Sequence, residues 1–369
     1  MPSPKYYSCL DQTYQPLRQT FGVGIGRSAF IPPLLHFPAR RMPMYEAERE
    51  FALDVAAQAS RLARRVQEEV VTNADALTKG DRSPVTMADL AIQAVVSRRL
   101  TDTFPPDHLL AEEDAGALKE SPEMAAKVLN LSRRAVPDFD AESLAAALDR
   151  GDYKGGGEER YWVLDPVDGT KGFLRGQHYA VALALVDHGQ VVVGVLGCPN
   201  LEVEPGNPEA GIGCLFIAVR GQGTAVRGVD GIDEREIHTD RITDPAHAVM
   251  CESVESAHAA HSVHGAIAAT LGVTAEPYRI DSQCKYAIVG RGEASIYLRL
   301  PSAKGYREKV WDHAAGALVI EEAGGMVTDL DGKPLDLTSG RFLGNQRGII
   351  ATNGNFHERV LDAAKEVRA

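Results

Sequence analysis

Four closely spaced apolar segments between residues 161 and 219 constrain the fold of this chain more than any other feature. Each is short, rich in β-branched or aromatic residues and bounded by turn-forming residues, which is typical of buried β-strands. The predicted strands are Tyr161–Leu164, Tyr179–Val186, Val191–Gly197 and Cys214–Val219. Before them, apolar residues recur at helical spacing from Phe51 to Val70 and predict a long amphipathic helix that ends at about Val71.

Helix and strand patterns alternate along the rest of the chain. Further helices are predicted from Met87 to about Leu100 and at His258–Leu271, Trp311–Ala323 and Asn355–Val367, and further strands at His108–Leu110, Val249–Glu252, Ser295–Leu300 and Gly348–Ala351. We expect one or two surface helices in Leu118–Gly157 and mainly loops in Gly221–Asp244. The alternation predicts a layered α/β sandwich, with an α+β subdomain in residues 44–235 and an α/β subdomain in residues 236–369.

Composition excludes several classes of protein. Of the 369 residues, 44% are apolar and 24% charged, as in an ordinary globular protein, and no segment approaches the roughly 20 apolar residues of a membrane span. The formal charge of −12 argues against a nucleic-acid partner, which requires a basic face. A small phosphorylated substrate stays compatible with that charge, because a bound divalent cation reverses the local sign. The five cysteines lack C-x-x-C spacing, which favours buried thiols in a reducing compartment.

Residues 1–43 differ from the remainder of the chain. They contain five Lys and Arg residues but a single acid, Asp11, and show no hydrophobic period. Basic residues with few acids are typical of an organelle transit peptide. A disordered extension, or a true start at Met42 or Met44, stays open as an alternative. We therefore expect an intracellular protein, in the cytoplasm, or in a chloroplast or mitochondrion if the extension is a transit peptide.

The segment "WVLDPVDGTKGFLRG", Trp162–Gly176, carries two aspartates three residues apart where a predicted strand ends. Asp-Gly and Pro are common in turns, so an ordinary structural turn is one interpretation. The position at a strand end, where α/β proteins place ligands, favours a metal site as the other. From this segment alone, the two interpretations stay open.

Acids occur at element ends in three further places: Asp89 inside a helix, Glu112–Asp114 after a strand, and Asp312 at a helix start. Each has a structural alternative. Asp89 could be an acid stabilised by the helix dipole, Glu112–Asp114 a solvated surface, and Asp312 an N-cap. One metal site would account for all of them, because Mg²⁺ prefers carboxylates, waters and phosphate oxygens as ligands. Two such ions about 3.5–4 Å apart could activate water for hydrolysis of a phosphate ester. Gly169 and Thr170 would offer N–H groups and a hydroxyl to that phosphate.

Three motifs in this order resemble the magnesium-dependent, lithium-sensitive phosphatases of the inositol monophosphatase superfamily. They are "AEED" (Ala111–Asp114), "DPVDGT" (Asp165–Thr170) and "WDHAAG" (Trp311–Gly316), and the resemblance runs from about Tyr45 to the C-terminus. Within the superfamily, four stretches are similar to the 3′(2′),5′-bisphosphate nucleotidases: Asp81–Asp89, Gly169–Leu185, Asp281–Pro301 and Glu308–Gly316. The resemblance implies the layered sandwich of the inositol monophosphatase fold.

The resemblance also implies roles for individual residues. The implied metal ligands are Glu112, Asp165, the Val167 carbonyl, Asp168 and Asp312, the residues that activate water are Asp89 and Thr170, and the substrate contacts are Gly169, Thr170, His258, Ser282, Lys285 and Arg299. The segment "HAAHSVHG" around His258 departs from the usual His-Ser-Ser-His of the family. Lys285 and Arg299 suit a second phosphate and lie far along the chain from the metal motifs, so we expect metal binding not to need them. Glu113 and Asp114 are expected to be structural.

The expected activity is Mg²⁺-dependent hydrolysis of the 3′-phosphate of adenosine 3′,5′-bisphosphate, and of 3′-phosphoadenylyl sulfate, which would clear a by-product of sulfation. An inositol polyphosphate or inositol monophosphate phosphatase on the same scaffold is the alternative, because fold analogy cannot separate substrates. A catalytically silent ligand-binding protein is a further alternative. It is opposed by the competent residues at every metal and water-activating position. We expect a monomer or weak dimer with a small-molecule substrate and neither membrane nor nucleic acid as a partner.

Overall fold

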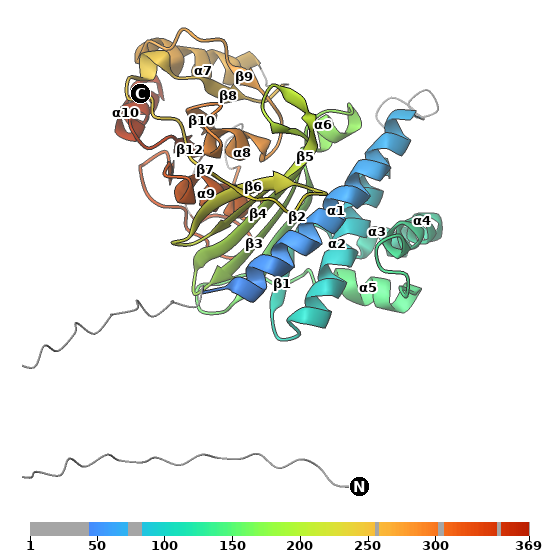
Figure 1. Cartoon of the computed structure of the whole chain (residues 1–369). Coiled ribbons are helices and arrows are strands. Elements are labelled where there is room, and N and C mark those ends of the chain that lie inside the picture. The colour runs from blue at the N-terminus through green and yellow to red at the C-terminus, as the bar shows by residue number, and fades with distance from the viewer. Residues whose placement is uncertain (1–43, 73–82, 255–257, 302–305, 345–347, 369) are drawn as a thin grey trace, which may run out of the picture. The chain divides into compact units, whose positions relative to one another are not determined.

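The computed structural model describes residues 44–72, 83–254, 258–301, 306–344 and 348–368 (Figure 1). The extension at 1–43 lies outside these residues, as does Cys9. The four described cysteines are buried and free of disulfides. No described helix is both long enough and apolar enough to cross a membrane.

Seven strands of the described chain form the first sheet, in the order of the sequence. They are β1 (His108–Ala111), β2 (Tyr161–Asp168), β3 (Ala180–Asp187), β4 (Gln190–Glu204), β5 (Asn207–Val219), β6 (Gly223–Gly228) and β7 (Arg235–Ile237). β1 and β2 pair in parallel, and the remaining neighbours are antiparallel. Because β1 and β2 run the same way, the residues that follow them meet at one edge of the sheet.

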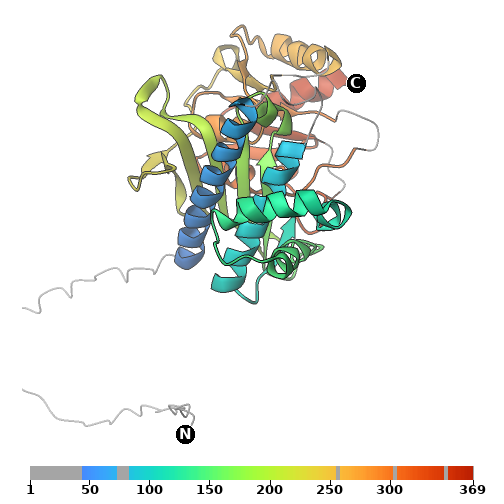
Figure 2. The ribbon, with the colours of Figure 1, turned by 90° about the vertical axis from the view of Figure 1, so that its right-hand side faces the viewer.

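Helices cover both faces of this sheet. Successive strand residues point to opposite faces, so Trp162 and Leu164 enter one core while Tyr161 and Val163 enter another. α1 (Glu46–Thr72) and α2 (Ser83–Thr103) cover the first face, as the blue and cyan helices of Figure 2 show. α8 (Cys284–Gly290) and α9 (Ala314–Glu322) cover the second. Gly194 allows the close approach of α9, since a Cβ there would lie 2.9 Å from the Ala315 carbonyl oxygen.

The second described sheet has five strands and packs on the other side of α8 and α9. Its order is β11 (Met326–Asp329), β12 (Ile349–Thr352), β10 (Ile296–Arg299), β8 (Met250–Glu252) and β9 (Tyr278–Arg279). Its far face packs against α7 (His258–Leu271) and α10 (His357–Arg368). The layers therefore alternate as helix, sheet, helix, sheet and helix, and the predicted layered sandwich is confirmed. The boundary at residue 235 stays a prediction.

Several local predictions are wrong. Gly221–Asp244 contains β6 and β7, because alternating residues such as Thr224 and Val226 are buried despite the glycines. The excursion after β1 contains three described helices, not one or two: α3 (Gly116–Glu120), α4 (Pro122–Arg133) and α5 (Ala141–Asp149). The short elements α6 (Thr170–Leu174), α8, β9 and β11 were not predicted, because segments of two to seven residues carry too little periodicity.

Candidate metal and phosphate site

The predicted acidic turn is an extended part of β2. Residues three apart on a regular strand face opposite sides, but the register of β2 against β3 shifts between Asp165 and Asp168. Asp165 is 2% exposed, whereas Asp168 is half-buried. Burial, and then the charges of Glu112 and Asp168, raise the pKa of Asp165 well above its usual range. The interpretation as a turn is wrong, but the irregular strand places the two carboxylates so that the charge of Asp168 raises the pKa of Asp165.

Asp89 lies on α2 and is 7% exposed. The helix begins at Ser83 and its first turn contains no acid, so the helix-dipole alternative for Asp89 is wrong. Burial raises the pKa of Asp89 well above its ordinary value, and the charges of Glu113 and Glu112 raise it further. Asp89 is therefore a buried acid that faces the end of β1.

Glu112 and Asp312 complete the group of acids. Glu112 follows β1 directly and is exposed overall. Partial desolvation of its carboxylate, together with the charges of Asp312, Glu113 and Asp168, still raises its pKa to about 7. Asp312 precedes α9, which begins at Ala314 and not at the predicted Trp311. The N-cap position belongs to His313, so the N-cap alternative for Asp312 is wrong. Acids from α2, from the ends of β1 and β2, and from the loop before α9 thus act on one another.

The donor set fits a hard divalent cation. Asp89 Oδ1 and Asp165 Oδ1 are buried and accept no hydrogen bond from any residue that the structure describes. Buried carboxylates are costly unless a cation or hydrogen bonds compensate them. Oxygen ligands from several carboxylates are what Mg²⁺ or Ca²⁺ prefers, whereas Zn²⁺ sites are usually built from Cys and His.

A cavity of about 250 Å³ opens beside these acids. Its lining includes seven predicted site residues: Asp168, Gly169, Thr170, Ser282, Lys285, Arg299 and Asp312. Gly169 has φ +95°, a left-handed conformation that ends β2 and allows α6 to begin at Thr170. The cavity therefore combines carboxylates, a helix start and two cations, as expected for a phosphorylated ligand.

Lys285 is 6% exposed and points into this cavity from α8. Its Nζ donates hydrogen bonds to Ser253 Oγ at 3.2 Å and to the Ile280 carbonyl at 3.4 Å. Burial lowers the pKa of Lys285, while the charge of Asp168 raises it. Lys285 is therefore a buried cation and not an ordinary surface charge.

Arg299 corrects the expectation that both cations are independent of the metal ligands. Its Nε lies 2.7 Å from Glu308 Oε2, and its Nη2 donates to Asp312 Oδ2 at 2.7 Å. His313 Nε2 also lies 3.1 Å from Glu308 Oε2. Although burial favours neutral Glu308, His313 and Arg299 lower its pKa. Arg299 thus already pairs with two members of the cluster of Glu308, Asp312 and His313, which has metal-ligand spacing.

The remaining predicted residues have different outcomes. Val167 is buried between the two aspartates of β2, and its role as a carbonyl ligand stays a prediction. His258 begins α7, but its side chain lies outside what the structure describes. Asp114 Oδ1 accepts from the Gly116 amide at 2.6 Å, as a structural residue would. The Gln93 side chain holds the backbone of Glu113 through bonds of 2.8 and 3.0 Å.

Sequence reasoning missed Gln283 and Glu308. Gln283 is 2% exposed and contacts Asp168, and Glu308 is 2% exposed and pairs with Arg299. Both lie inside the quoted motif segments Asp281–Pro301 and Glu308–Gly316. The signal was their position next to predicted site residues, but one residue of either type more often lies on the surface.

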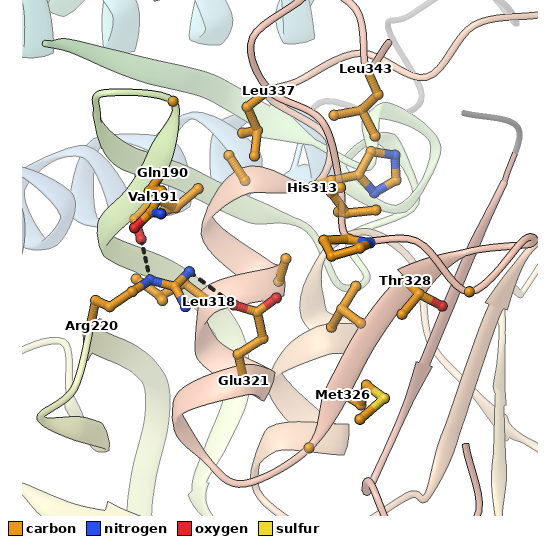
Figure 3. Close-up of a pocket in the computed structure, with 18 residues that line it drawn as sticks. Gln190, Val191, Arg220, His313, Leu318, Glu321, Met326, Thr328, Leu337 and Leu343 are labelled. Atoms are coloured by element: carbon orange, nitrogen blue, oxygen red, sulfur yellow. Dashed lines mark hydrogen bonds and ion pairs between the residues drawn. The ribbon is translucent and has the colours of Figure 1, made fainter. Parts of the chain in front are cut away.

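A larger cavity, of about 600 Å³, is lined by α9, β11 and the loop that follows β11 (Figure 3). Its walls are mainly apolar, and at its rim Arg220 donates to the Val191 carbonyl at 2.8 Å and to Glu321 Oε2 at 2.9 Å. Its described lining includes His313 but none of the predicted site residues. Its lining carboxylate, Glu321, is already paired with Arg220, so we assign the chemistry to the smaller cavity.

The fold and this arrangement of acids define a class of metal-dependent phosphatases, and comparison with known proteins agrees. The profile of the inositol monophosphatase family matches residues 44–369. The chain belongs to this family, as predicted. The IMPase of Thermotoga maritima superposes with a TM-score of 0.58 at 21% identity, over 87% of this chain and 98% of that one. The SuhB protein of Bartonella henselae gives 0.57 at 22% identity, over 87% and 99%. These two likenesses show the fold.

Curated relatives are more similar in sequence. A 3′(2′),5′-bisphosphate nucleotidase of Schizosaccharomyces pombe is 39% identical over 339 residues, covering 88% of this chain and 96% of its own length. The protein of the same name from Oryza sativa is 43% identical over 340 residues, covering 87% and 94%. The predicted resemblance to this branch of the family is confirmed.

Proposed function

We propose that this chain is a Mg²⁺-dependent phosphatase that converts adenosine 3′,5′-bisphosphate to AMP and phosphate. The observation that supports this most is one cavity of about 250 Å³ that carries Asp168 and Asp312 together with Lys285 and Arg299. The carboxylates that would hold metals and the cations that would hold a second phosphate thus line the same cavity. The names of the curated relatives support the same substrate class.

The chain's own residues would divide the work of hydrolysis. Bound divalent ions would supply Lewis-acid activation of water and of the phosphate ester. Glu112, Asp165, Asp168, Asp312 and the Val167 carbonyl would hold them. Asp89, whose Oδ1 is buried with no described partner, would accept a hydrogen bond from the attacking water, and the Thr170 hydroxyl would help to orient it.

The reaction would be a direct displacement. The water oxygen would form a bond to phosphorus as the bond from phosphorus to the 3′-oxygen breaks. The proton that the water loses would pass to Asp89, and the released 3′-oxygen would take up a proton from solvent. Gly169 N–H and the Thr170 hydroxyl would contact the transferred phosphoryl group. Lys285 and Ser282 would hold the other phosphate, with Arg299 and the side chain of His258 as further contacts.

One experiment separates the candidate substrates. Phosphate release by the full chain would be measured with adenosine 3′,5′-bisphosphate, 3′-phosphoadenylyl sulfate and inositol monophosphate, with Mg²⁺ and with a chelator. We expect the nucleotides to exceed inositol monophosphate in kcat/KM by at least about tenfold, because Lys285 has no second phosphate to bind in the latter. Preference for inositol monophosphate would favour the inositol phosphatase alternative. Phosphate release by the wild type that does not exceed the background seen with Asp168→Ala would favour a silent binding protein.

Several finer properties belong to the same proposal. We propose lithium sensitivity, a role in clearing a by-product of sulfation, and a monomer or weak dimer inside the cell. A lithium titration of the Mg²⁺-dependent rate and sedimentation of the full chain test the first and third. The targeting role of residues 1–43 is tested by following a fluorescent fusion with and without them.

A further inference from the structure

The turn Asp281–Gln283 joins the two halves of the candidate metal site. It lies between β9 of the second sheet and α8, and it packs against the end of β2 in the first sheet. Ser282 has φ +67°, which is unusual for a residue other than glycine. A Cβ on Gly169 would lie 2.8 Å from Ser282 Cβ, so the end of β2 and this turn are in close contact. A left-handed non-glycine residue of this kind is retained where the surroundings fix it.

Gln283 makes contacts with both sources of predicted metal ligands. Its backbone N–H donates a short hydrogen bond to Asp168 Oδ2, at the end of β2. Its side chain Nε2 donates to the Trp311 carbonyl at 2.9 Å, and its Oε1 accepts from the Gly316 amide at 3.2 Å. Trp311 and Gly316 lie on either side of Asp312. One residue thus touches Asp168 and also spans the segment that carries Asp312.

The chemistry of the carboxamide explains why a glutamine fits here. Gly316 is the third residue of α9, and its N–H is among those that a helix cannot satisfy internally. The N-cap residue His313 contributes no side-chain capping bond within the described structure. The buried Trp311 carbonyl needs a donor, and the Gly316 amide needs an acceptor. A side-chain amide offers both, whereas a carboxylate or an apolar side chain of the same length does not.

We propose that Gln283 is a positioning residue, which holds Asp312 at a fixed separation from Asp168 so that both can bind the same metal centre. This inference rests on the proposed metal-dependent function. Asp168 belongs to the first sheet and Asp312 to a loop that precedes a helix between the sheets. Without the carboxamide, the start of α9 and its acid lose their tie to the turn that contacts Asp168. Outer contacts of this kind typically change metal affinity about 10–100-fold.

The test is metal binding by the full chain, measured by calorimetric titration with Mn²⁺ and Mg²⁺ in the absence of substrate. Gln283→Met keeps the length and apolar volume of the side chain but removes both side-chain hydrogen bonds, to the Trp311 carbonyl and from the Gly316 amide. The backbone bond to Asp168 is retained. We expect its Kd for the ions to rise about 10–100-fold, with the phosphatase rate largely restored when the ion concentration is raised in proportion. A merely structural role would lower stability but leave the Kd unchanged.

Gln67→Met is the matched control. Gln67 is 5% exposed, donates to the Phe173 and Gln177 carbonyls at 3.0 and 3.1 Å, and accepts from Asn200 at 2.8 Å. It therefore ties backbone through a buried carboxamide without contacting a predicted ligand. We expect a comparable fall in melting temperature with an unchanged Kd. If Gln283→Met does not fold, Gln283→Asn, which keeps the amide but shortens it, is measured in its place with the same expectation.

Two results would overturn the inference. An unchanged Kd in the folded Gln283 variant, beside a wild type that binds the ions, would overturn the positioning role alone. A wild-type chain that binds neither ion would overturn the proposed metal site and this inference together.

Discussion

Two groups of side chains within the same site hold their carboxylates under opposite electrostatic conditions. Glu308 accepts from Arg299 and His313, and these partners lower its pKa. Asp165 is buried with one oxygen unpartnered among the described residues, and burial with neighbouring acids raises its pKa well above its usual range. We call the first group, Arg299, Glu308 and His313, the paired network, and the second, Asp89, Glu112, Asp165 and Asp168, the acid cluster.

The two groups differ in whether the protein itself compensates their charges. Every charge in the paired network has a protein partner, so the network stabilises the fold without a ligand. The carboxylates of the acid cluster repel one another, which lowers stability, and selection for stability alone would not retain them. Asp312 lies between the two, because Arg299 donates to it while its charge raises the pKa of Glu112. The acid cluster is therefore the part of the site that requires a cation from outside.

The largest expected effect is on turnover. Asp165→Asn or Asp168→Asn should lower the Mg²⁺-dependent rate by about a thousandfold, because metal ligands supply several kcal/mol of transition-state stabilisation. Steady-state phosphate release measures this, with circular dichroism to show that the fold survives. Asp114→Asn is the control, since Asp114 accepts from the Gly116 amide and is not among the predicted metal ligands. Full activity of both variants in chelator-treated buffer would contradict the two-metal proposal.

Substitution of the two cations that line the cavity, Lys285 and Arg299, should affect the two candidate substrates differently. The Lys285 ammonium donates to Ser253 and the Ile280 carbonyl and lies 5.4 Å from the centroid of the Tyr297 ring. None of these groups is a predicted metal ligand, so Lys285→Met should raise KM for adenosine 3′,5′-bisphosphate by about 10–150-fold and leave inositol monophosphate nearly unchanged. Arg299→Met should impair both substrates, because it also releases Asp312 and Glu308. Kinetics of both variants on both substrates measure this. Equal losses on the two substrates for Lys285→Met would assign it a structural role.

In the absence of metal, removal of a carboxylate charge should lower the free energy of unfolding in the paired network and raise it in the acid cluster. Glu308→Gln removes the charge that faces Arg299 and should lower the free energy of unfolding by about 1–3 kcal/mol. Asp165→Asn relieves repulsion within the acid cluster and should raise it. Urea unfolding in a chelator measures both. Destabilisation of the same size by both variants would remove the distinction between the two groups.

The sequence predicted the acids better than the contacts among them. Asp165, Asp168, Glu112 and Asp312 lie at element ends, and such positions follow from apolar runs and local motifs. The bulge that aligns Asp165 with Asp168 was missed, because Pro and Gly in "DPVDGT" favour a turn and the pairing with β3 overrides that preference. Local pattern thus identified the residue types but not the backbone geometry.

The missed contacts are those between segments far apart in the sequence. Gln283 contacts Asp168 across 115 positions, and no periodicity or spacing records such a contact. Arg299 and Asp312 are only 13 residues apart, but their pairing depends on β10 and on the loop before α9 meeting in space. β6 and β7 were missed although they lie close to β5 in the sequence, because each is a strand by virtue of its neighbour: β6 pairs with β5, and β7 pairs with β6.

A smaller effect is expected on the pH dependence of the metal-free chain. The pKa of Glu112 is raised to about 7 in the folded chain, so the folded state holds more protons than the unfolded state above the ordinary Glu value. Stability contributed by this group is present at low pH and is lost as pH rises through about 7. Melting temperature in a chelator should therefore fall by a few degrees from pH 5.5 to pH 8. Saturating Mg²⁺ should reverse the trend, and an unchanged trend with Mg²⁺ would place Glu112 outside the metal centre.

A second pH effect concerns His357, which begins α10 and is 3% exposed. The Thr328 hydroxyl donates to the Asp329 carbonyl, so it accepts from His357 Nε2 at 2.8 Å, while Nδ1 accepts from the Thr352 hydroxyl at 2.9 Å. This arrangement suits the neutral ring, and burial lowers the pKa of His357 to about 4.

The unfolded chain protonates this histidine at about pH 6.5, whereas the folded chain resists until about pH 4. His357 therefore contributes a loss of stability as pH falls from 6.5 to 4, with a slope of at most about 1.4 kcal/mol per pH unit. His357→Gln cannot take up this proton, so the stability difference between wild type and variant should shift in favour of the variant on acidification. Urea unfolding at pH 7, 6 and 5 measures the shift. A constant difference across that range would show that His357 takes up its proton equally in the folded and unfolded states.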